Sequence, residues 1–185
     1  MGKRSDFERK SRDYYDTPYE AVIPLASHLP KSFTYIEPCS GKSYLTWHLS
    51  EFGGDVLAEY DIEPKNDRMS KLDALTLAER HIPQGTDFII TNPPWIRTKK
   101  SGYLLHKLIE VFANIRPTWL LIDSDWHDTK QSGKLLDDYC TKIVPIGRVK
   151  WFGNMTGKDN CSWYMFDKNK WHDYISPVIE FYPRI

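Results

Sequence analysis

The chain has 185 residues, of which 41% are hydrophobic, and its 25 basic residues balance 25 acidic ones. This length predicts one domain with a sizeable core rather than two, and the zero net charge excludes a global electrostatic pull toward nucleic acid. Three cysteines without a Cys-x-x-Cys spacing predict neither a disulfide framework nor a zinc site, so we expect no metal and a reducing cytoplasm.

Apolar runs in this chain are too short to cross a membrane. None approaches the ~20 residues that a spanning helix needs, and the first residues lack the apolar core of a signal peptide. We therefore expect no membrane partner. Residues 1–13 are rich in Lys, Arg, Asp and Ser, which predicts a flexible basic arm ahead of a single domain over residues 14–185.

The first predicted helix covers residues 18–29. Thr17 is its expected N-cap, Pro18 stands at its first position, and Glu20 completes a Thr-x-x-Glu capping box. Because a helix N-terminus favours a nearby negative charge, the same segment suits the carboxylate of a ligand.

A strand is expected over residues 33–37, and it leads into Glu37-Pro38-Cys39-Ser40-Gly41 and then into a helix over 42–52. Gly41 allows the backbone to come close to a ligand directly before a helix N-terminus. The sequence therefore places a candidate ligand-binding loop at the end of this strand.

A second strand is expected over residues 55–60, and Asp61-Ile62-Glu63 follows it. A carboxylate at the tip of such a strand accepts hydrogen bonds from ribose hydroxyls in nucleotide-binding sheets. Asp61 is our choice for that role, with Glu63 as the second candidate.

After a short strand over 69–72, Asp73 and a helix over 74–81, the strand over 87–91 ends at Asn92-Pro93-Pro94-Trp95. Proline fixes φ near −65°, lacks an N–H and keeps the preceding residue extended. This turn therefore presents an amide, free carbonyls and a flat ring, a combination that binds planar amino groups. The alternative is a Pro-Pro loop that only ends a buried strand.

The rest of the chain completes an α/β fold. A helix is expected over 102–115, with a core stripe formed by Leu104, Leu108, Phe112 and Ile115. A strand over 118–122 follows, and the apolar runs at 143–152 and 162–166 predict an antiparallel hairpin. Alternation of strands and helices predicts a mostly parallel sheet with helices on both faces.

Taken in order, these segments resemble the S-adenosylmethionine-dependent amino methyltransferases of the γ arrangement. That family has a closing Tyr-x-Thr-Pro segment, an Asp/Glu-Pro-x-x-Gly-x-Gly cofactor loop, a ribose acid, an adenine acid and an Asn/Asp-Pro-Pro-aromatic turn, which match residues 14 to 95. Ser43, preceded by Lys42, stands where the loop's second glycine is usual. Segments 116–123, 147–151 and 158–164 are similar to short phage and prophage adenine-specific DNA methyltransferases.

The resemblance implies a Rossmann-like class I methyltransferase fold: a single domain with a mostly parallel seven-stranded sheet and a C-terminal antiparallel hairpin. It also implies that S-adenosyl-L-methionine is the cofactor and is bound by Tyr15, Thr17, Pro18, Glu37, Pro38, Cys39, Gly41, Asp61, Ile62, Asp73, Ala74 and Asn92. The catalytic residues would be Asn92, Pro93, Pro94 and Trp95.

The activity that the resemblance implies is methyl transfer to N6 of adenine in DNA. The Asn92 oxygen and the Pro93 carbonyl would accept the two amino hydrogens, and Trp95 would stack on the flipped base. The turn serves any planar amino or amide group, so an RNA base, cytosine N4 and protein glutamine stay open as substrates. A non-catalytic cofactor-binding protein stays open as well.

DNA is the expected partner because basic and aromatic residues alternate late in the chain, a pattern that suits phosphate contacts and base stacking. A hairpin with solvated lysines is the alternative. The expected substrate contacts are Trp95, Arg97, Lys99, Lys100, Arg148, Lys150 and Trp151. Because no large recognition domain follows the turn, we expect low sequence specificity or a specificity partner protein. A phage origin would place the protein in the cytoplasm of the host.

Overall fold

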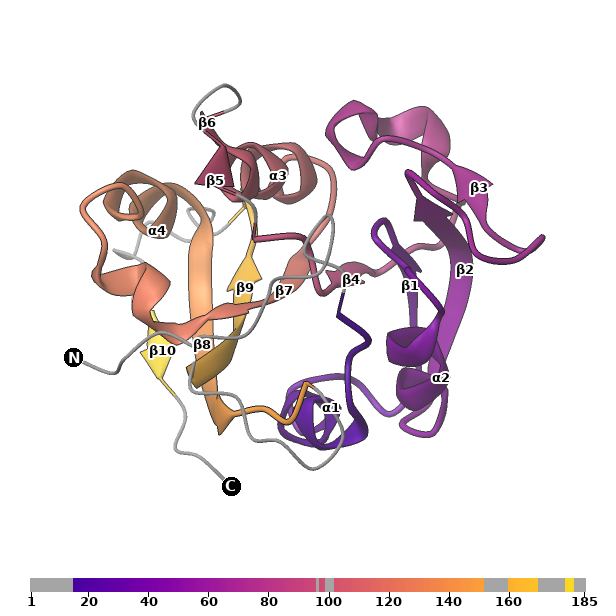
Figure 1. Ribbon diagram of the computed structural model, residues 1–185, viewed down its shortest axis with the longest axis horizontal. Helices are drawn as coiled ribbons and strands as arrows, with labels where there is room; N and C mark the ends of the chain where they lie inside the picture. Colours follow the sequence, from indigo (N-terminus) through magenta and orange to yellow (C-terminus); the bar gives the residue numbers. More distant parts are fainter. Residues whose placement is uncertain (1–14, 96, 99–101, 152–159, 170–178, 182–185) are drawn as a thin grey trace.

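The computed structural model describes residues 15–95, 97–98, 102–151, 160–169 and 179–181 (Figure 1). The basic arm expected over residues 1–13 lies outside these ranges. One large sheet runs through the molecule, and helices pack against it.

The sheet has eight strands in the order β10-β8-β9-β7-β4-β1-β2-β3. Along the chain they are β1 (Phe33–Glu37), β2 (Gly54–Asp61), β3 (Ser70–Lys71), β4 (Phe88–Thr91), β7 (Thr118–Asp123), β8 (Cys140–Arg148), β9 (Asn160–Phe166) and β10 (Glu180–Phe181). A separate two-stranded sheet pairs β5 (Arg97–Thr98) with β6 (Gly102–Tyr103).

The expected mostly parallel sheet with a C-terminal antiparallel pair is confirmed. Strands β3, β2, β1, β4 and β7 pair in parallel, whereas β9 runs antiparallel to both β7 and β8. These are the seven strands anticipated from the sequence. The two-residue strand β10 adds an eighth at the edge, where it pairs in parallel with β8.

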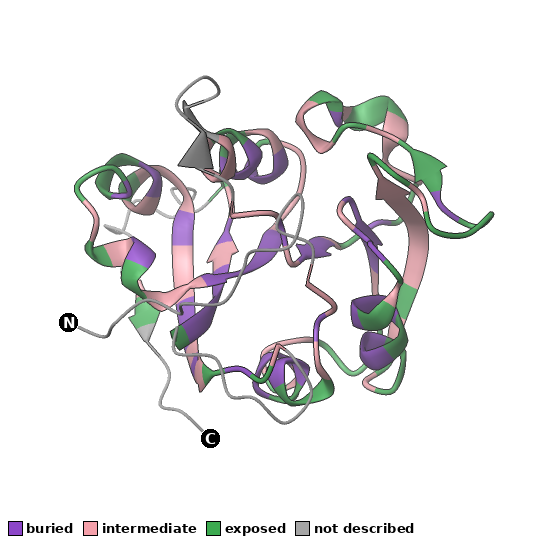
Figure 2. Ribbon diagram, viewed as in Figure 1, coloured by how far each residue is buried: buried purple, intermediate pink, exposed green. Residues whose placement is uncertain are grey.

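Two hydrophobic cores lie on opposite faces of the sheet, because successive residues of a strand point to opposite sides. Helices α1 (Tyr19–Ala26) and α2 (Tyr44–Ser50) share one core with Ile90 and Trp163. Helices α3 (Leu104–Ala113) and α4 (Gly133–Tyr139) share the other core with Ile89 and Tyr164. Figure 2 shows the buried residues concentrated on the central strands β1, β4, β7 and β9.

The predicted helix over 74–81 is wrong. This segment forms two 3-10 turns instead, η2 (Ala74–Thr76) and η3 (Glu79–His81). Between them Leu77 turns to ψ 136° and its side chain is buried in the core, so the chain cannot continue as one helix. Helix α4 and the 3-10 turn η4 (Ser124–Asp128) had no counterpart in the sequence prediction, because such short segments show too little periodicity.

Within the described ranges, no helix combines the length and the apolar character that crossing a bilayer requires.

Candidate cofactor pocket and catalytic turn

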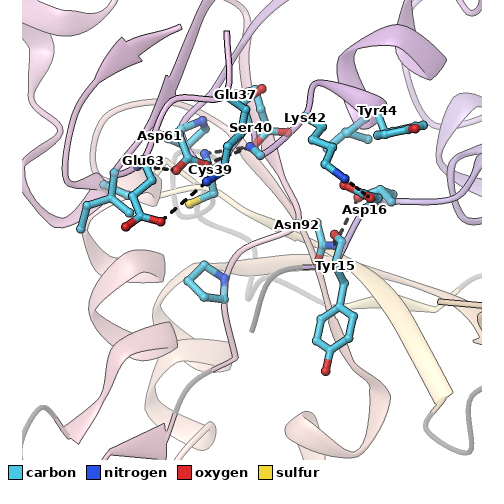
Figure 3. Close-up of a pocket in the computed structure, with 18 of the residues that line it drawn as sticks. Tyr15, Asp16, Glu37, Cys39, Ser40, Lys42, Tyr44, Asp61, Glu63 and Asn92 are labelled. Atoms are coloured by element: carbon cyan, nitrogen blue, oxygen red, sulfur yellow. Dashed lines mark hydrogen bonds and ion pairs between the residues drawn. The ribbon is translucent and has the colours of Figure 1, made fainter. Parts of the chain in front are cut away.

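A pocket of about 680 Å³ opens where β1, β2 and β4 end, beside the segment that precedes α1 (Figure 3). This is the edge where open α/β sheets bind their ligands. Of the residues predicted to bind the cofactor, only Pro18 is absent from the pocket lining. The others line it: Tyr15, Thr17, Glu37, Pro38, Cys39, Gly41, Asp61, Ile62, Asp73, Ala74 and Asn92. The structure thus brings together residues that are up to 77 positions apart in the chain.

The loop after β1 is tied to the end of β2 by the carboxylate of Asp61. Its Oδ2 accepts the backbone N–H of Gly41 at 2.9 Å, and its Oδ1 accepts that of Glu63 at 2.7 Å. Gly41 has φ 59°, a left-handed conformation that glycine adopts without steric cost. Each carboxylate oxygen has two lone pairs, so Asp61 can hold the loop and still accept a hydroxyl of a bound ribose.

Ser43 has a left-handed backbone conformation, which glycine adopts without steric cost. Its φ is 65°, and its hydroxyl oxygen is buried without a hydrogen-bond partner in the described part of the chain. The side chain does not cap α2, although Ser43 is the N-cap residue. A serine in this left-handed conformation therefore adds local strain to the loop.

Ser43→Gly is expected to raise the free energy of unfolding by about 1 kcal/mol. Relief of the left-handed strain, about 1–2 kcal/mol, and removal of an unpaired hydroxyl outweigh the about 0.5–1 kcal/mol lost through the greater freedom of unfolded glycine. Urea unfolding of both proteins measures this difference. Ser50→Gly at the end of α2 is the matched control and should be destabilising. Equal destabilisation by both changes would show that no strain exists at Ser43.

Glu37 is a fully buried carboxyl group in the wall of the pocket, with 1% of its surface exposed. Burial, with a smaller effect of the carboxylates of Glu59 and Asp61, raises its pKa to about 8, although the Cys39 N–H, 3.2 Å from Oε1, favours the ionised form. Near neutral pH this group therefore holds a proton while the pocket is empty. A cation bound beside it would favour the ionised form.

Raising the pH from about 5 to 8 is expected to lower the free energy of unfolding through Glu37. The folded protein keeps this proton up to a pKa of about 8, whereas an unfolded glutamate loses it near 4.5. The stabilisation is therefore complete below the unfolded value and is lost as pH rises through the folded value. Glu37→Gln should flatten the slope in this window, as measured by denaturant unfolding at several pH values. Glu79→Gln, at an exposed site, is the control, and a wild-type slope in Glu37→Gln would contradict the assignment.

One part of the pocket wall combines apolar side chains with the carboxylate of Asp73. Ile62 is 48% exposed and lines the cavity, and Leu104 and Leu108 of α3 line it as well. Asp73 caps η2 by accepting the Leu75 N–H at 3.0 Å, so its carboxylate has a fixed position. A flat apolar ring with an amino group at its edge, such as adenine, matches this surface.

The side-chain amide of Asn92 is fixed by the segment that precedes α1. Its Nδ2 donates to the Tyr15 carbonyl at 3.3 Å and to the Thr17 hydroxyl at 3.2 Å. Both amide hydrogens are thereby committed, and the remaining polar atom of this pocket-lining side chain is the acceptor Oδ1. The turn therefore offers one oriented acceptor beside the cavity.

The predicted capping role of Thr17 is wrong. Pro18 is the N-cap of α1, which begins at Tyr19, and no side chain caps this helix end. The Thr17 hydroxyl is buried and accepts from Asn92 instead. Pro18 itself is outside the pocket lining, and its carbonyl accepts the Ala21 N–H at 3.0 Å.

The prolines and the aromatic residue of the turn lie in different surroundings. Pro94 lines the pocket, whereas Pro93 is buried and outside the lining. Trp95 is half-buried, and its Nε1 donates to the Leu121 carbonyl at 3.2 Å. Its ring meets Trp151 edge to face at 6.1 Å, and Trp151 in turn lies 5.9 Å from Tyr15. These three rings form an aromatic cluster next to Asn92.

The basic residues expected to contact substrate are only partly described. Arg148 ends β8 and is exposed, as is Lys150, so both are accessible to a polyanion. Lys99, Lys100 and the side chain of Arg97 lie outside the described residues.

Several pocket residues escaped the sequence prediction. Asp16 and Lys42 lie in the predicted closing segment and loop, at positions that the motif does not specify. The acidic residues of the lining are Asp16, Glu37, Asp61, Glu63 and Asp73, of which Glu37 holds a proton near neutral pH, and the basic residues are Lys42 and Lys65. An acidic lining of this kind suits a ligand with positive charge. Among the described residues, no cluster of His, Cys, Asp and Glu has the composition of a metal site.

No protein-family model and no curated protein sequence matches the chain. Solved structures do match in fold. A proposed class I S-adenosylmethionine-dependent methyltransferase from Listeria monocytogenes superposes with a TM-score of 0.63 at 13% identity, over 89% of this chain and 64% of that protein. A proposed RNA methyltransferase from Pyrococcus horikoshii gives 0.61 at 12% identity, over 90% and 94% of the two chains.

A third match is the modification subunit of a proposed type I restriction enzyme from Vibrio vulnificus, with a TM-score of 0.61 at 11% identity. It covers 91% of this chain but only 46% of the subunit, so the present chain spans less than half of that protein. At these identities the likeness concerns the fold, which is that of class I methyltransferases.

Proposed function

We propose that the pocket binds S-adenosyl-L-methionine and that the chain is an N-methyltransferase. The pocket lies at the sheet edge where this fold binds ligands, and it gathers a glycine loop, a carboxylate at the tip of β2 and an acid beside an apolar surface. Its acidic lining matches a cofactor that carries a sulfonium and an ammonium group.

The main support for N-methyl transfer is the orientation of the Asn92 side-chain amide, which two hydrogen bonds fix. Donation of both its hydrogens to Tyr15 and Thr17 fixes Oδ1 as an acceptor beside the pocket. An aromatic amino group is a poor nucleophile because its lone pair is delocalised into the ring. Acceptors that bind both of its hydrogens favour a pyramidal nitrogen and stabilise the positive charge that develops during transfer.

When bound, S-adenosylmethionine supplies an electrophilic methyl group on sulfur. The Asn92 Oδ1 and the Pro93 carbonyl would each accept one amino hydrogen, so that the nitrogen lone pair is held toward the cofactor side of the turn. The aromatic cluster of Trp95, Trp151 and Tyr15 would hold the ring of the substrate. Most of the acceleration would come from this positioning.

We propose N6 of adenine in DNA as the acceptor, with low sequence specificity. Exposed Arg148 and Lys150 beside Trp151 support contacts to a nucleic-acid backbone next to the aromatic cluster. The modification subunit that shares the fold belongs to a restriction system. A specificity partner protein belongs to the same proposal. The phage origin suggested by the sequence stays a prediction.

Incubation with methyl-labelled S-adenosylmethionine is expected to label DNA, and digestion to nucleosides should yield N6-methyladenine. Single strands or mismatched duplexes should be used at least as well as perfect duplex, because an unpaired base avoids an unpairing cost of about a few kcal/mol. Binding should weaken steeply as salt rises, since phosphate contacts would dominate.

Parallel assays distinguish the remaining candidate substrates. Ribosomal RNA, cytosine-containing DNA and a release-factor glutamine peptide are assayed in parallel, and the modified residue is identified by mass. Label in one of these without N6-methyladenine would overturn the DNA-adenine proposal and keep N-methyltransferase activity. Cofactor binding without any transfer, even with a partner-containing lysate, would favour a non-catalytic binding protein.

A further inference from the structure

Two oppositely charged side chains meet at the end of the pocket remote from Asp61. Lys42 of the cofactor loop places its Nζ 3.4 Å from Oδ2 of Asp16, which precedes α1. Figure 3 shows this pair on one side of the pocket, with Asn92 below it, and Asp61 and Glu63 on the other side. The pair joins two segments 26 residues apart across the cavity rim.

The second oxygen of Asp16 has no hydrogen-bond partner among the described residues. Oδ1 is buried and makes no hydrogen bond within the described part of the chain, although the side chain as a whole is 31% exposed and lines the pocket. A buried carboxylate oxygen without a donor is costly. A cationic donor bound in the cavity would satisfy it.

The two lysines of the lining lie at opposite ends of the pocket. Of the two lysines that line the pocket, Lys65 lies with Glu63, 3.7 Å from its Oε2, at the ribose end. Lys42 therefore supplies the ammonium group at the opposite end, where it is 55% exposed at its side chain. An anionic ligand group at that end would meet Lys42.

We propose that Asp16 and Lys42, which stand outside the motif positions, bind the α-amino acid end of the cofactor. The inference rests on the cofactor proposed above. An amino acid zwitterion carries an ammonium and a carboxylate on one carbon, and an ion pair of 3.4 Å offers the complementary arrangement. Asp16 Oδ1 accepts from the ammonium, and Lys42 Nζ donates to the carboxylate.

The pair also connects the cofactor to the catalytic turn. Asp16 stands between Tyr15 and Thr17, whose carbonyl and hydroxyl hold the Asn92 amide. A ligand that binds Asp16 therefore fixes the backbone on which the orientation of Asn92 depends. Asp16 and Lys42 are positioning residues for the transfer, in addition to being ligands of the zwitterion.

Calorimetry with two ligands tests the assignment. S-adenosylhomocysteine carries the amino acid end, whereas 5′-methylthioadenosine has the same adenosine and thioether without it. Asp16→Asn and Lys42→Gln should each weaken S-adenosylhomocysteine binding about tenfold, the loss expected for a charged hydrogen bond, and leave 5′-methylthioadenosine binding within about twofold. Lys134→Gln, in the exposed pair with Asp138 on α4, is the matched control and should change neither affinity.

The affinities of the wild-type protein and the variants distinguish failure of the amino acid assignment from failure of the cofactor proposal. If the wild-type protein binds neither ligand, the proposed cofactor is overturned. If it binds both and the variants weaken both equally, or neither, the amino acid assignment is overturned while the cofactor proposal stands. Thermal unfolding of each variant checks folding, and the half-exposed Lys42 carries the test if Asp16→Asn does not fold.

Discussion

Replacing Asn92 with alanine is expected to lower the rate of methyl transfer by about 10²–10³-fold, the loss typical of removing one group that stabilises transition-state charge. The lost acceptor Oδ1 would face the substrate amine, so its contribution appears in the transition state rather than in cofactor binding. Affinity for S-adenosylhomocysteine should therefore stay within about threefold. Labelled transfer and calorimetry on the same preparation measure the two effects.

Three further variants test this result. Asn114→Ala removes an exposed asparagine amide that is bound to Glu110 and Tyr139, and it should leave transfer unchanged. Thr17→Val removes the hydroxyl that accepts from Asn92 Nδ2, so it should lower turnover without altering the turn itself, and Thr17→Ser should restore it. Equal losses of cofactor binding and turnover in Asn92→Ala would place Asn92 in the cofactor site instead.

The strands could be predicted because each is an apolar run ended by residues with strong local rules. The run at 33–37 coincides with β1, and the one at 87–91 differs from β4 by one residue. Both end at a proline-containing turn, which fixes the local conformation without tertiary help. The same local rules identified the pocket, because parallel strands bring their carboxyl ends to one edge.

Capping at Thr17 could not be predicted correctly, since the local rule competes with a partner 75 positions away. A hydroxyl before Pro-x-Glu has the pattern of a cap, yet Asn92 takes it as an acceptor. The helix over 74–81 failed for a related reason: burial of Leu77 interrupts it. Long-range packing decided both cases, and a single sequence does not display it.

The contact between Asp16 and Lys42 could not be predicted from the sequence either. Each is an ordinary charged residue in a polar segment, and a solvated surface is the usual place for such residues. Their meeting requires that the loop after β1 and the segment before α1 lie on the same rim, which follows from the sheet order and not from spacing. Motif positions place Tyr15 and Thr17 in the pocket but do not indicate that Asp16 and Lys42 form a pair there.

Removing the carboxylate of Asp61 is expected to weaken S-adenosylhomocysteine binding about ten- to a hundredfold, which corresponds to about 1.5–3 kcal/mol. Two losses combine in Asp61→Ala: the acceptor for the ribose hydroxyls and the bonds that hold Gly41 and Glu63 in the loop. Calorimetry gives the affinity, and urea unfolding shows how far the loop's own stability falls.

Comparison with Glu63 decides which acid serves the ribose. Glu63→Gln removes a carboxylate in the same rim that lies beside Lys65, and its backbone N–H still bonds to Asp61. If Asp61 binds the ribose, Glu63→Gln should lower affinity by less than about threefold. 5′-Methylthioadenosine should lose as much affinity as S-adenosylhomocysteine in Asp61→Ala, because both carry the ribose. A larger loss in Glu63→Gln than in Asp61→Ala would move the ribose contact to Glu63 and leave Asp61 as the residue that holds the loop.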